Sequence, residues 1–436
     1  MHGIRRRLAT GLAALWLALG CAQADAWSPD SGGRTPVARP GTPLAATRAL
    51  DSSGLRSKIN SALAGVGGAT GVWVRDMDAH GAGLLFTHDA GARRTPASNE
   101  KLFTTAAFLD ALGSDATLKT RVFPRGAVGQ SGILSGDLVI VGDGDPAFGT
   151  ARFAHAHDQP VTRLSALARK IAQAGVTAIK GRVLADDTIF DRDRYASADV
   201  SPLSGLSFND GYDDGHYSHA PELVAARALK QSLRKLGVDV AGRVGHADLG
   251  RKTLETRPLA QIASPTIAKL IEETNVPSNN FFAEMLLKRL AAEGGKVGTR
   301  KRGVRKVESF AESLGTDVHA YDGSGLSRSN GVTAEEVGKL LVAMASLNDE
   351  DEAAAFTGSL PIAGKEGTVA DRMRGTAAEG NCETKTGTLS DASALSGYCK
   401  AGPHTIAFSI LMNSVNVDAA RKAQDRIAAA IARYRP

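Results

Sequence analysis

Apolar residues recur three and four positions apart in several segments of the chain, a spacing that predicts amphipathic helices. Residues 161–174 are one example, and a glycine follows them as a stop signal. The same reasoning predicts helices at residues 53–64, 98–112, 222–236, 267–275, 281–290 and 418–433. Shorter apolar runs predict strands at residues 71–75, 84–88, 121–126 and 132–141, with three more in the tail before the last helix. Helices and strands mixed in this way predict an α/β (α+β) fold.

The region from about residue 119 to 262 has a strand and helix pattern of its own. Each of two predicted helices in this region is followed by a glycine and then by a similar short sequence, residues 176–183 after the first helix and residues 238–244 after the second. Together these segments form a faint internal repeat. We therefore expect residues 119–262 to be an inserted α/β domain. Residues 49–118 and 263–436 then form the main domain, which the insertion interrupts.

The first residues have the features of a secretory signal peptide. Three arginines at positions 5–7 precede thirteen apolar residues, and small residues follow. Thirteen residues are fewer than the roughly 20 that a membrane-spanning helix needs, and we expect no transmembrane segment later in the chain. We expect residues 1–24 to be removed, residues 25–48 to be a disordered lead-in, and the mature protein to be exported to the periplasm. Lipid anchoring through Cys21 is the alternative.

Composition and charge exclude several classes of protein. The chain has 436 residues, of which 43% are hydrophobic and 22% charged, a balance typical of globular proteins rather than collagen-like, disordered or coiled-coil chains. The net charge of +6 includes the three arginines of the predicted signal peptide. The remainder is too small to indicate a nucleic-acid partner. Three cysteines are too few for a disulfide scaffold.

The first motif that indicates catalysis is Ser98-Asn-Glu-Lys101, of the pattern S-x-x-K. Residues three apart share a helical face, so the amine of Lys101 can reach the hydroxyl of Ser98. Pro96 places Ser98 at the start of the helix, where free N–H groups favour negative charge. A second copy of the pattern, from Ser232 to Lys235, falls in the middle of a helix, and we interpret it as solvated surface.

The second motif is Ser278-Asn-Asn280, of the pattern S-x-N. Pro277 interrupts a helical run just before it, and an apolar helix follows. A tight loop between two helices can aim Ser278 and Asn280 in the same direction, with Asn279 turned aside. Ser207-Phe-Asn209 has the same spacing, so spacing alone does not distinguish them.

The third motif is Lys385-Thr-Gly387, the only K-T-G in the chain. It lies on a predicted strand, where Lys385 and Gly387 share a face. A glycine there allows a substrate backbone to approach the strand closely. The order S-x-x-K, S-x-N and K-T-G is the set found in penicillin-binding proteins and class A β-lactamases.

Two cysteines flank the predicted hairpin that contains this motif. If the hairpin turns between Ser390 and Asp391, Cys382 and Cys399 face each other across the strands, close enough for a disulfide. An oxidising compartment favours that bond. Two buried free thiols are the alternative.

With these motifs in place, the sequence resembles the class C low-molecular-mass penicillin-binding proteins of the D-alanyl-D-alanine carboxypeptidase/endopeptidase type. The resemblance runs from about residue 50 to 436 and includes further phrases, namely Gly142-Asp-Gly-Asp-Pro146, Asp322-Gly-Ser-Gly-Leu-Ser-Arg328, Leu360-Pro-Ile-Ala-Gly364 and Leu395-Ser-Gly-Tyr398. It implies a transpeptidase-type domain, with an antiparallel sheet flanked by helices. Many family members carry a larger insertion with a third module, whereas Ser98 and Ser278 are only 180 residues apart here.

The resemblance implies a serine-type peptidase acting on peptidoglycan peptides. Ser98 would attack the carbonyl between two D-alanines and form an acyl-enzyme, and β-lactams would acylate the same serine. Lys101 would serve as the base if burial and a neighbouring cation lower its pKa. Ser278 would relay the proton to the leaving amine, and Asn280 would orient Lys101 and the substrate.

The K-T-G strand would bind the end of the substrate. Lys385 and Thr386 would hold the terminal carboxylate, and Gly387 would allow the close approach. The resemblance places the oxyanion hole at the backbone N–H groups of Ser98 and Thr388. No metal and no cofactor is required.

Two more residues match family positions that contact the peptide side chain. Arg328 would pair with a diaminopimelate carboxylate, and Asp145 would meet the ammonium group of the same side chain. Asp145 precedes a proline, so a turn is the alternative explanation for it.

Other functions remain as alternatives. A β-lactamase shares the motifs but needs fast deacylation, and no E-x-x-x-N phrase of the usual deacylating kind lies between Asn280 and Lys385. The G-x-S-x-G of ordinary esterases and the H-E-x-x-H of zinc peptidases are absent. A non-catalytic cell-wall binding protein would need neither Ser98 nor Lys101.

Overall fold

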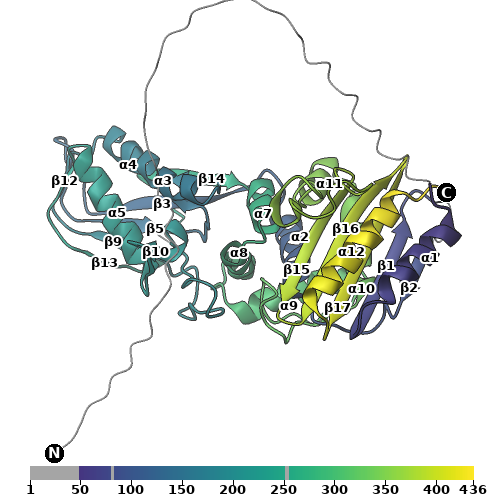
Figure 1. Ribbon diagram of the computed structural model, residues 1–436. Helices are drawn as coiled ribbons and strands as arrows, with labels where there is room; N and C mark the ends of the chain where they lie inside the picture. The colour runs from purple at the N-terminus through teal and green to yellow at the C-terminus, as the bar shows by residue number, and fades with distance from the viewer. Residues whose placement is uncertain (1–48, 80–82, 251–254) are drawn as a thin grey trace, which may run out of the picture. The chain divides into compact units, whose positions relative to one another are not determined.

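Five antiparallel strands form the sheet that carries the K-T-G motif, in the order β15-β16-β17-β1-β2 (Figure 1). They are β15 (Cys382–Leu389), β16 (Ala392–Ala401), β17 (His404–Asn413), β1 (Ala69–Asp76) and β2 (Leu84–His88). β17 pairs with β1, so strands far apart in the sequence lie side by side. The computed structural model describes residues 49–79, 83–250 and 255–436. The predicted signal peptide, the lead-in and Cys21 lie outside these residues.

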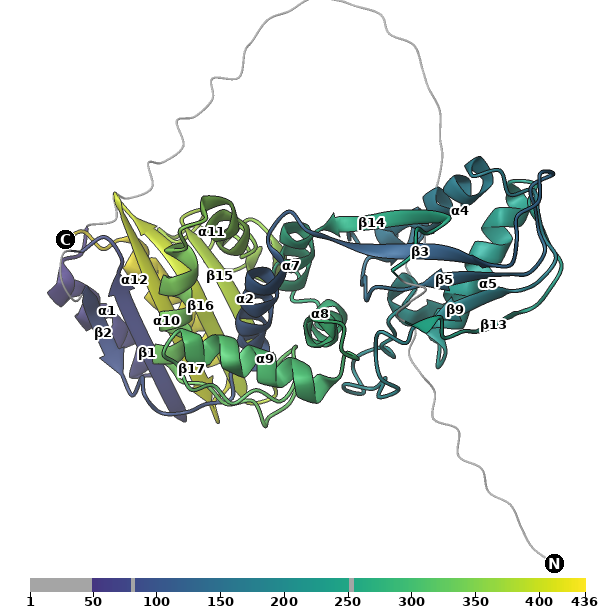
Figure 2. The same ribbon diagram turned by 180° about the vertical axis from the view of Figure 1, so that it is seen from behind.

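Side chains alternate along the central strands and supply both faces of this sheet with apolar residues. In β1, Val72 and Val74 pack in one core and Trp73 packs in the other. α1 (Ser52–Leu63) and α12 (Val417–Ala432) cover one face of the sheet, and α2 (Glu100–Leu112) and α10 (Ala334–Ala345) cover the other (Figures 1 and 2). The first pair of helices contributes side chains to the core with Val72 and Val74, and the second pair contributes to the core with Trp73. Because both faces are covered, β1 and β17 are apolar along most of their length.

The core that contains Trp73 also includes most of the remaining helices on that side of the sheet. They are α7 (Ile267–Asn275), α8 (Asn280–Ala292), α9 (Arg300–Ser313) and α11 (Glu350–Thr357). α8 is buried on nearly every side, which explains why its sequence is apolar almost throughout. Because the helix is packed on nearly every side, the few polar side chains that it carries are held in fixed positions.

A second sheet has the order β13-β9-β5-β3-β14. Its strands are β3 (Thr117–Arg125), β5 (Asp137–Val141), β9 (Val183–Asp186), β13 (Val244–His246) and β14 (Ala260–Thr266). β5, β9 and β13 are parallel, whereas β3 runs antiparallel to both of its neighbours. α4 (Leu164–Gln173) and α5 (Pro221–Lys235) pack into a core with this sheet.

The faint internal repeat has a structural counterpart. α4 leads into β8 (Ala178–Ile179) and β9, and α5 leads into β12 (Asp239–Val240) and β13. Equivalent strands of the two copies pair in parallel, with Val244 opposite Val183. The short elements nearby are β4 (Ile133–Leu134), β6 (Phe148–Gly149), β7 (Thr162–Arg163), β10 (Tyr212–Asp213), β11 (His216–Tyr217) and α3 (Ala151–Ala156).

The second sheet and the first belong to one compact unit, which includes all the described residues. Phe190, Val200 and Leu203, from the region of the second sheet, pack in the same core as residues of α8. The ion pair between Lys288 of α8 and Asp191, at 2.6 Å, adds a polar contact between these regions. The division into a main domain and an inserted domain at residues 119–262 stays a prediction.

Several predicted elements differ from the observed ones. The predicted strand 132–141 is interrupted at Ser135 and Gly136, so it forms β4 and β5 in separate sheets. The helix predicted from residue 161 begins at Leu164, because the two residues before it form β7. None of the helices within residues 49–79, 83–250 and 255–436 combines the length and the apolar character that a membrane-spanning segment needs.

Candidate active site

Ser98 lies in a short 3₁₀ turn, η1 (Ala97–Asn99), that leads directly into α2. Ala97 has a φ of 49°, a left-handed conformation that costs a non-glycine residue about 1–3 kcal/mol. The loop that contains Gly325 packs directly against this strained turn. A Cβ on Gly325 would lie only 1.8 Å from the carbonyl oxygen of Ala97, which shows how close the two backbones are. Ser98 is therefore presented at the mouth of α2, half-buried, by a turn that tertiary contacts support.

Lys101, one turn further along, is fully buried and makes three polar contacts. Its Nζ lies 3.0 Å from the Oγ of Ser98, 2.7 Å from the Oδ1 of Asn280 and 2.7 Å from the carbonyl oxygen of Ser324. Burial lowers the pKa of Lys101 to about 7. A neutral amine at this position can accept the proton of the Ser98 hydroxyl.

The S-x-N segment lies between α7 and α8. Ser278 has a φ of 63°, and Asn279 caps α8 by accepting a hydrogen bond from the N–H of Phe282 at 3.1 Å. Asn279 is thus turned to the helix end, while Ser278 and Asn280 both face the cleft that contains Ser98. The Nζ of Lys385 donates to the Oγ of Ser278 at 2.9 Å.

Lys385 is the first residue of the K-T-G motif and lies on β15. It has no exposed surface, and its Nζ also donates to the carbonyl oxygen of Thr386 at 2.9 Å. Burial and the nearby charge of Lys101 lower the pKa of Lys385 well below its usual range. Thr386 and Thr388 line the cleft, whereas Lys385 does not. Lys385 therefore contacts Ser278 directly, and its assignment to the substrate carboxylate stays a prediction.

The structure gives a further reason for a glycine at position 387, which the sequence did not indicate. A Cβ at this position would lie 2.7 Å from the carbonyl oxygen of Pro96 and 3.1 Å from the backbone nitrogen of Ser98. The glycine allows β15 to pass directly over the turn that carries Ser98. This brings the strand next to the proposed oxyanion hole at the N–H groups of Ser98 and Thr388, which stays a prediction.

The three motifs open onto one cleft of about 690 Å³. They contribute Ser98, Ser278, Asn280, Thr386 and Thr388 to its wall. The remaining wall comes from Leu326, from Thr368 and Arg372, and from the α12 residues Asp418, Arg421, Lys422 and Asp425. The second copies of the motifs, at Ser232 and Ser207, are not part of this wall.

Asp145 and Arg328 do not line the cleft. Asp145 is 3% exposed, its Oδ1 accepts a hydrogen bond from the N–H of Ala147 at 2.9 Å, and burial raises its pKa to about 7. Arg328 pairs with Asp391 at 2.6 Å, at the turn between β15 and β16. The assignment of Asp145 and Arg328 to a diaminopimelate side chain stays a prediction.

Cys382 and Cys399 are register partners on β15 and β16 and form a disulfide. The bond lies in the core between the sheet and α12, and it joins the two strands at the end away from the turn. It therefore ties together the hairpin that carries the K-T-G motif.

Sequence reasoning missed a buried acidic group beneath Lys101. The Oε1 of Glu284 accepts hydrogen bonds from the N–H groups of Gly323 at 3.0 Å and Ser324 at 2.8 Å. Glu284 thereby holds the loop whose carbonyl contacts Lys101, and its charge raises the pKa of Lys101 against the effect of burial. A glutamate four residues after Asn280, inside an apolar helix, was the available signal.

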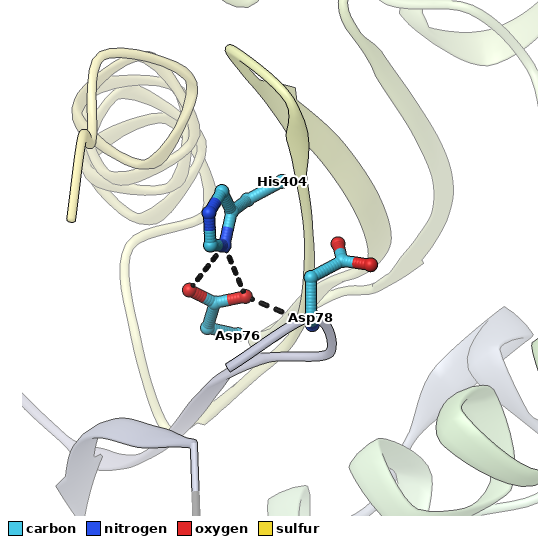
Figure 3. A group of neighbouring side chains, drawn as sticks. All are labelled: Asp76, Asp78 and His404. Carbon is cyan, nitrogen blue, oxygen red and sulfur yellow. Dashed lines mark hydrogen bonds and ion pairs between the residues drawn. The ribbon is translucent and has the colours of Figure 1, made fainter. Parts of the chain in front are cut away.

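Asp76, Asp78 and His404 form a group whose side-chain atoms lie within 4.8 Å of one another, as metal ligands do (Figure 3). The Nδ1 of His404 lies 2.9 and 2.8 Å from the two carboxylate oxygens of Asp76. The Oδ2 of Asp78 accepts a hydrogen bond from the N–H of Thr405 at 2.6 Å. Because His404 pairs with Asp76 and the carboxylate of Asp78 accepts from the backbone of Thr405, we assign the group the structural role of joining the end of β1 to the start of β17.

The fold agrees with that of a known protein. Penicillin-binding protein 4 of Haemophilus influenzae superposes with a TM-score of 0.70 at 19% identity, covering 84% of this chain and 97% of that one. The fold and the Ser98–Lys101 pair together define a serine enzyme of the penicillin-binding class.

The chain belongs to the D-Ala-D-Ala carboxypeptidase 3 (S13) family, whose sequence profile matches residues 56–202 and 214–434. A D-alanyl-D-alanine carboxypeptidase of Actinomadura sp. (strain R39) is 32% identical over 493 residues, covering 91% of this chain and 88% of the relative. Carboxypeptidase DacB of Mycolicibacterium smegmatis is 27% identical, covering 87% and 84%. The alignment with the Actinomadura enzyme is longer than this chain, so that enzyme contains residues that this chain lacks.

Proposed function

We propose that the protein is an exported serine-type D-Ala-D-Ala carboxypeptidase and DD-endopeptidase that cleaves peptidoglycan peptides and is acylated by β-lactams. One observation carries the proposal. Lys101 contacts both Ser98 and Asn280, while Lys385 contacts Ser278, and the hydroxyls of both serines open onto the same cleft. Family membership supports the reaction, and the N-terminal sequence pattern supports export to the periplasm.

Acylation begins when the Oγ of Ser98 attacks the carbonyl carbon of the penultimate D-residue and Lys101 takes the hydroxyl proton. The C–N bond then breaks, and the leaving amine takes the proton of Ser278. Lys385 replaces that proton through its 2.9 Å contact. A positive charge thus moves from Lys385 to Lys101, in accord with the mutual repulsion that disfavours two buried ammonium groups.

Deacylation reverses these transfers. A water molecule attacks the ester carbonyl, and its proton passes through Ser278 to Lys385. The bond to the Oγ of Ser98 breaks, and Lys101 returns its proton to that oxygen. The net result is hydrolysis of one amide bond, with both lysines restored to their starting states.

The test is to incubate the purified protein with a peptide that ends in D-Ala-D-Ala and to measure released D-alanine. We expect release that a stoichiometric amount of penicillin blocks, because penicillin occupies Ser98 as a slowly hydrolysed ester. Rapid turnover of penicillin would instead indicate a β-lactamase. Binding of wall peptides without hydrolysis and without covalent penicillin would indicate a binding protein.

Glu284→Gln is expected to move the acidic limb of the kcat/KM profile to lower pH by roughly half a unit to one unit. Burial raises the pKa of Glu284 to about 7, and its carboxylate in turn raises the pKa of Lys101. A neutral amide removes that effect, so Lys101 loses its proton at lower pH. The amide oxygen can still accept from the N–H groups of Gly323 and Ser324, and the melting temperature serves as a control. An acidic limb that stays in place or moves upward would contradict this role.

A further inference from the structure

Asn275, the last residue of α7, is fully buried and belongs to none of the three motifs. Its Nδ2 donates to the Oγ1 of Thr105 at 3.1 Å and to the Oγ of Ser359 at 2.9 Å. Its Oδ1 has no hydrogen-bond partner among the residues that the structure describes. A buried acceptor without a partner destabilises a fold. Stability alone therefore does not explain an asparagine at this core position.

The first of the two donated bonds leads to the helix that carries Lys101. Thr105 lies on α2, one turn after Lys101, and its Oγ1 donates to the carbonyl oxygen of Lys101 at 2.7 Å. Because this hydroxyl has given its only proton to that carbonyl, it can accept from the Nδ2 of Asn275 but cannot donate to it. Asn275 thus joins the end of α7 to the turn of α2 that begins at Lys101.

The second donated bond leads to the segment that follows α11. The Oγ of Ser359 donates to the carbonyl oxygen of Phe356 at 2.7 Å, so this hydroxyl also can only accept from Asn275. Since both hydroxyls are committed in the same way, only the NH2 group of the amide fits between them. The side chain of Asn275 is therefore fixed from two directions.

Ser359 begins a segment that reaches the K-T-G strand. It is followed by Leu360-Pro-Ile-Ala-Gly364, one of the phrases of the family resemblance, which lies outside the cleft wall. The carbonyl oxygen of Pro361 accepts a hydrogen bond from the N–H of Thr384 at 2.9 Å. Thr384 immediately precedes Lys385 on β15. The phrase therefore connects the buried amide to the third motif.

The backbone of Asn275 contacts the remaining motif. Its carbonyl oxygen accepts a hydrogen bond from the N–H of Ser278 at 3.3 Å. This bond lies within the turn between α7 and α8, where Ser278 has a left-handed φ of 63°. A strained conformation of this kind persists only where the surrounding structure holds it. Asn275 thus contacts, or connects to, the segments of all three motifs.

We propose that Asn275 is a positioning residue for acylation, which holds the α2 turn, the S-x-N turn and the K-T-G strand at the spacing that the proton transfers need. This role rests on the proposed function. The transfers use contacts between these segments, from Lys101 to Asn280 at 2.7 Å and from Lys385 to Ser278 at 2.9 Å. A misplacement of about 1 Å can lower a rate by roughly 10²-fold. Asn275 acts only through these contacts, because it is fully buried and is not part of the cleft wall.

The experiment compares the parent protein with Asn275→Leu, which keeps the approximate size of the side chain and removes the amide. We expect the rate constant for acylation by a fluorescent penicillin to fall by about 10–100-fold, and kcat for D-alanine release to fall to a similar extent at a nearly unchanged KM. The fraction of molecules that finally carry label should equal that of the parent. The melting temperature should change little, because the substitution removes the unpartnered Oδ1 together with the two donated bonds.

Thr274→Val is the matched control. Thr274 is the neighbouring residue on α7, is equally buried, and its Oγ1 donates to the carbonyl oxygen of Leu270 in the same helix at 2.8 Å. This variant loses a buried hydrogen bond without losing a link between motifs, so it should keep the parent's acylation rate. Thr105→Val should slow acylation as Asn275→Leu does, and Thr105→Ser, which retains the hydroxyl, should restore most of the rate.

The possible outcomes are distinct. An Asn275→Leu variant with the parent's acylation rate would overturn the positioning role and leave the proposed function intact. A smaller labelled fraction with an unchanged rate constant would mean that Asn275 only stabilises the fold, and would overturn the role as well. Equal slowing in Thr274→Val would do the same, because the loss of any buried polar group on α7 would then suffice. A parent protein that neither takes the penicillin label nor releases D-alanine would overturn the proposed function together with this role.

Discussion

Ser98→Ala is expected to abolish covalent labelling by a fluorescent penicillin and to slow D-alanine release by roughly 10⁴–10⁶-fold. The substitution removes the only atom that bonds the acyl group in the proposed mechanism. It also leaves the turn intact, because neither the strained Ala97 nor the contact of Gly325 with it depends on the Ser98 hydroxyl. The measurements are gel fluorescence after labelling and the rate of D-alanine release.

Ser232→Ala is the control for this experiment. Ser232 heads the second S-x-x-K pattern but lies within α5, away from the cleft, so this variant should label like the parent. Label that persists on Ser98→Ala would place the nucleophile elsewhere. Loss of label in both variants would indicate general damage to the protein.

Lys101→Met is expected to lower the rate of acylation by roughly 10²–10⁴-fold while retaining the nucleophile. Met has a comparable length and no titratable group, so it fills the buried space without supplying a base. The acceptors on Asn280 and Ser324 lose their donor, which we expect to lower stability by about 1–3 kcal/mol per unsatisfied group. The rate of penicillin labelling measures the first effect, and thermal denaturation measures the second.

The pH profile of the parent protein tests the same base. Because the pKa of Lys101 is about 7, kcat/KM should fall as the pH drops below about 7, where the amine becomes protonated and cannot accept the proton of Ser98. Lys235→Met, at the exposed end of α5, should keep both the rate and this acidic limb. A profile that stays flat down to pH 5, or a Lys101→Met variant with the parent's rate, would exclude Lys101 as the base.

Contacts within one element were predictable because backbone geometry sets them. The spacing of Ser98 and Lys101 places them one turn apart on any helix, and the structure gives their side-chain atoms a separation of 3.0 Å. The cysteines at 382 and 399 become partners once the hairpin turn is located. The family resemblance supplied the association between the motifs, which no periodicity in the sequence contains.

Contacts between elements were less predictable. The contact between Lys385 and Ser278 could not be read from the sequence, because it depends on how β15 packs against the loop before α8, whereas the role of Lys385 at the substrate carboxylate stays a prediction. Gly387 was attributed to substrate approach, which stays a prediction, and the structure adds a second reason, the close backbone of Pro96. Asn275 and Glu284 belong to no motif, and only the packing of α7 and α8 brings them to the site.

The sequence by itself therefore determined the mixed helix and strand content, the three motifs, and the pairing of residues a few positions apart. Helical and strand periods are properties of the local backbone, which neighbouring residues alone can specify. Only the tertiary structure decided which charges are buried and why Lys101 and Asn280, 179 residues apart, touch. Burial and long-range contact depend on how whole elements pack against each other, and that packing sets the pKa of each lysine in the site.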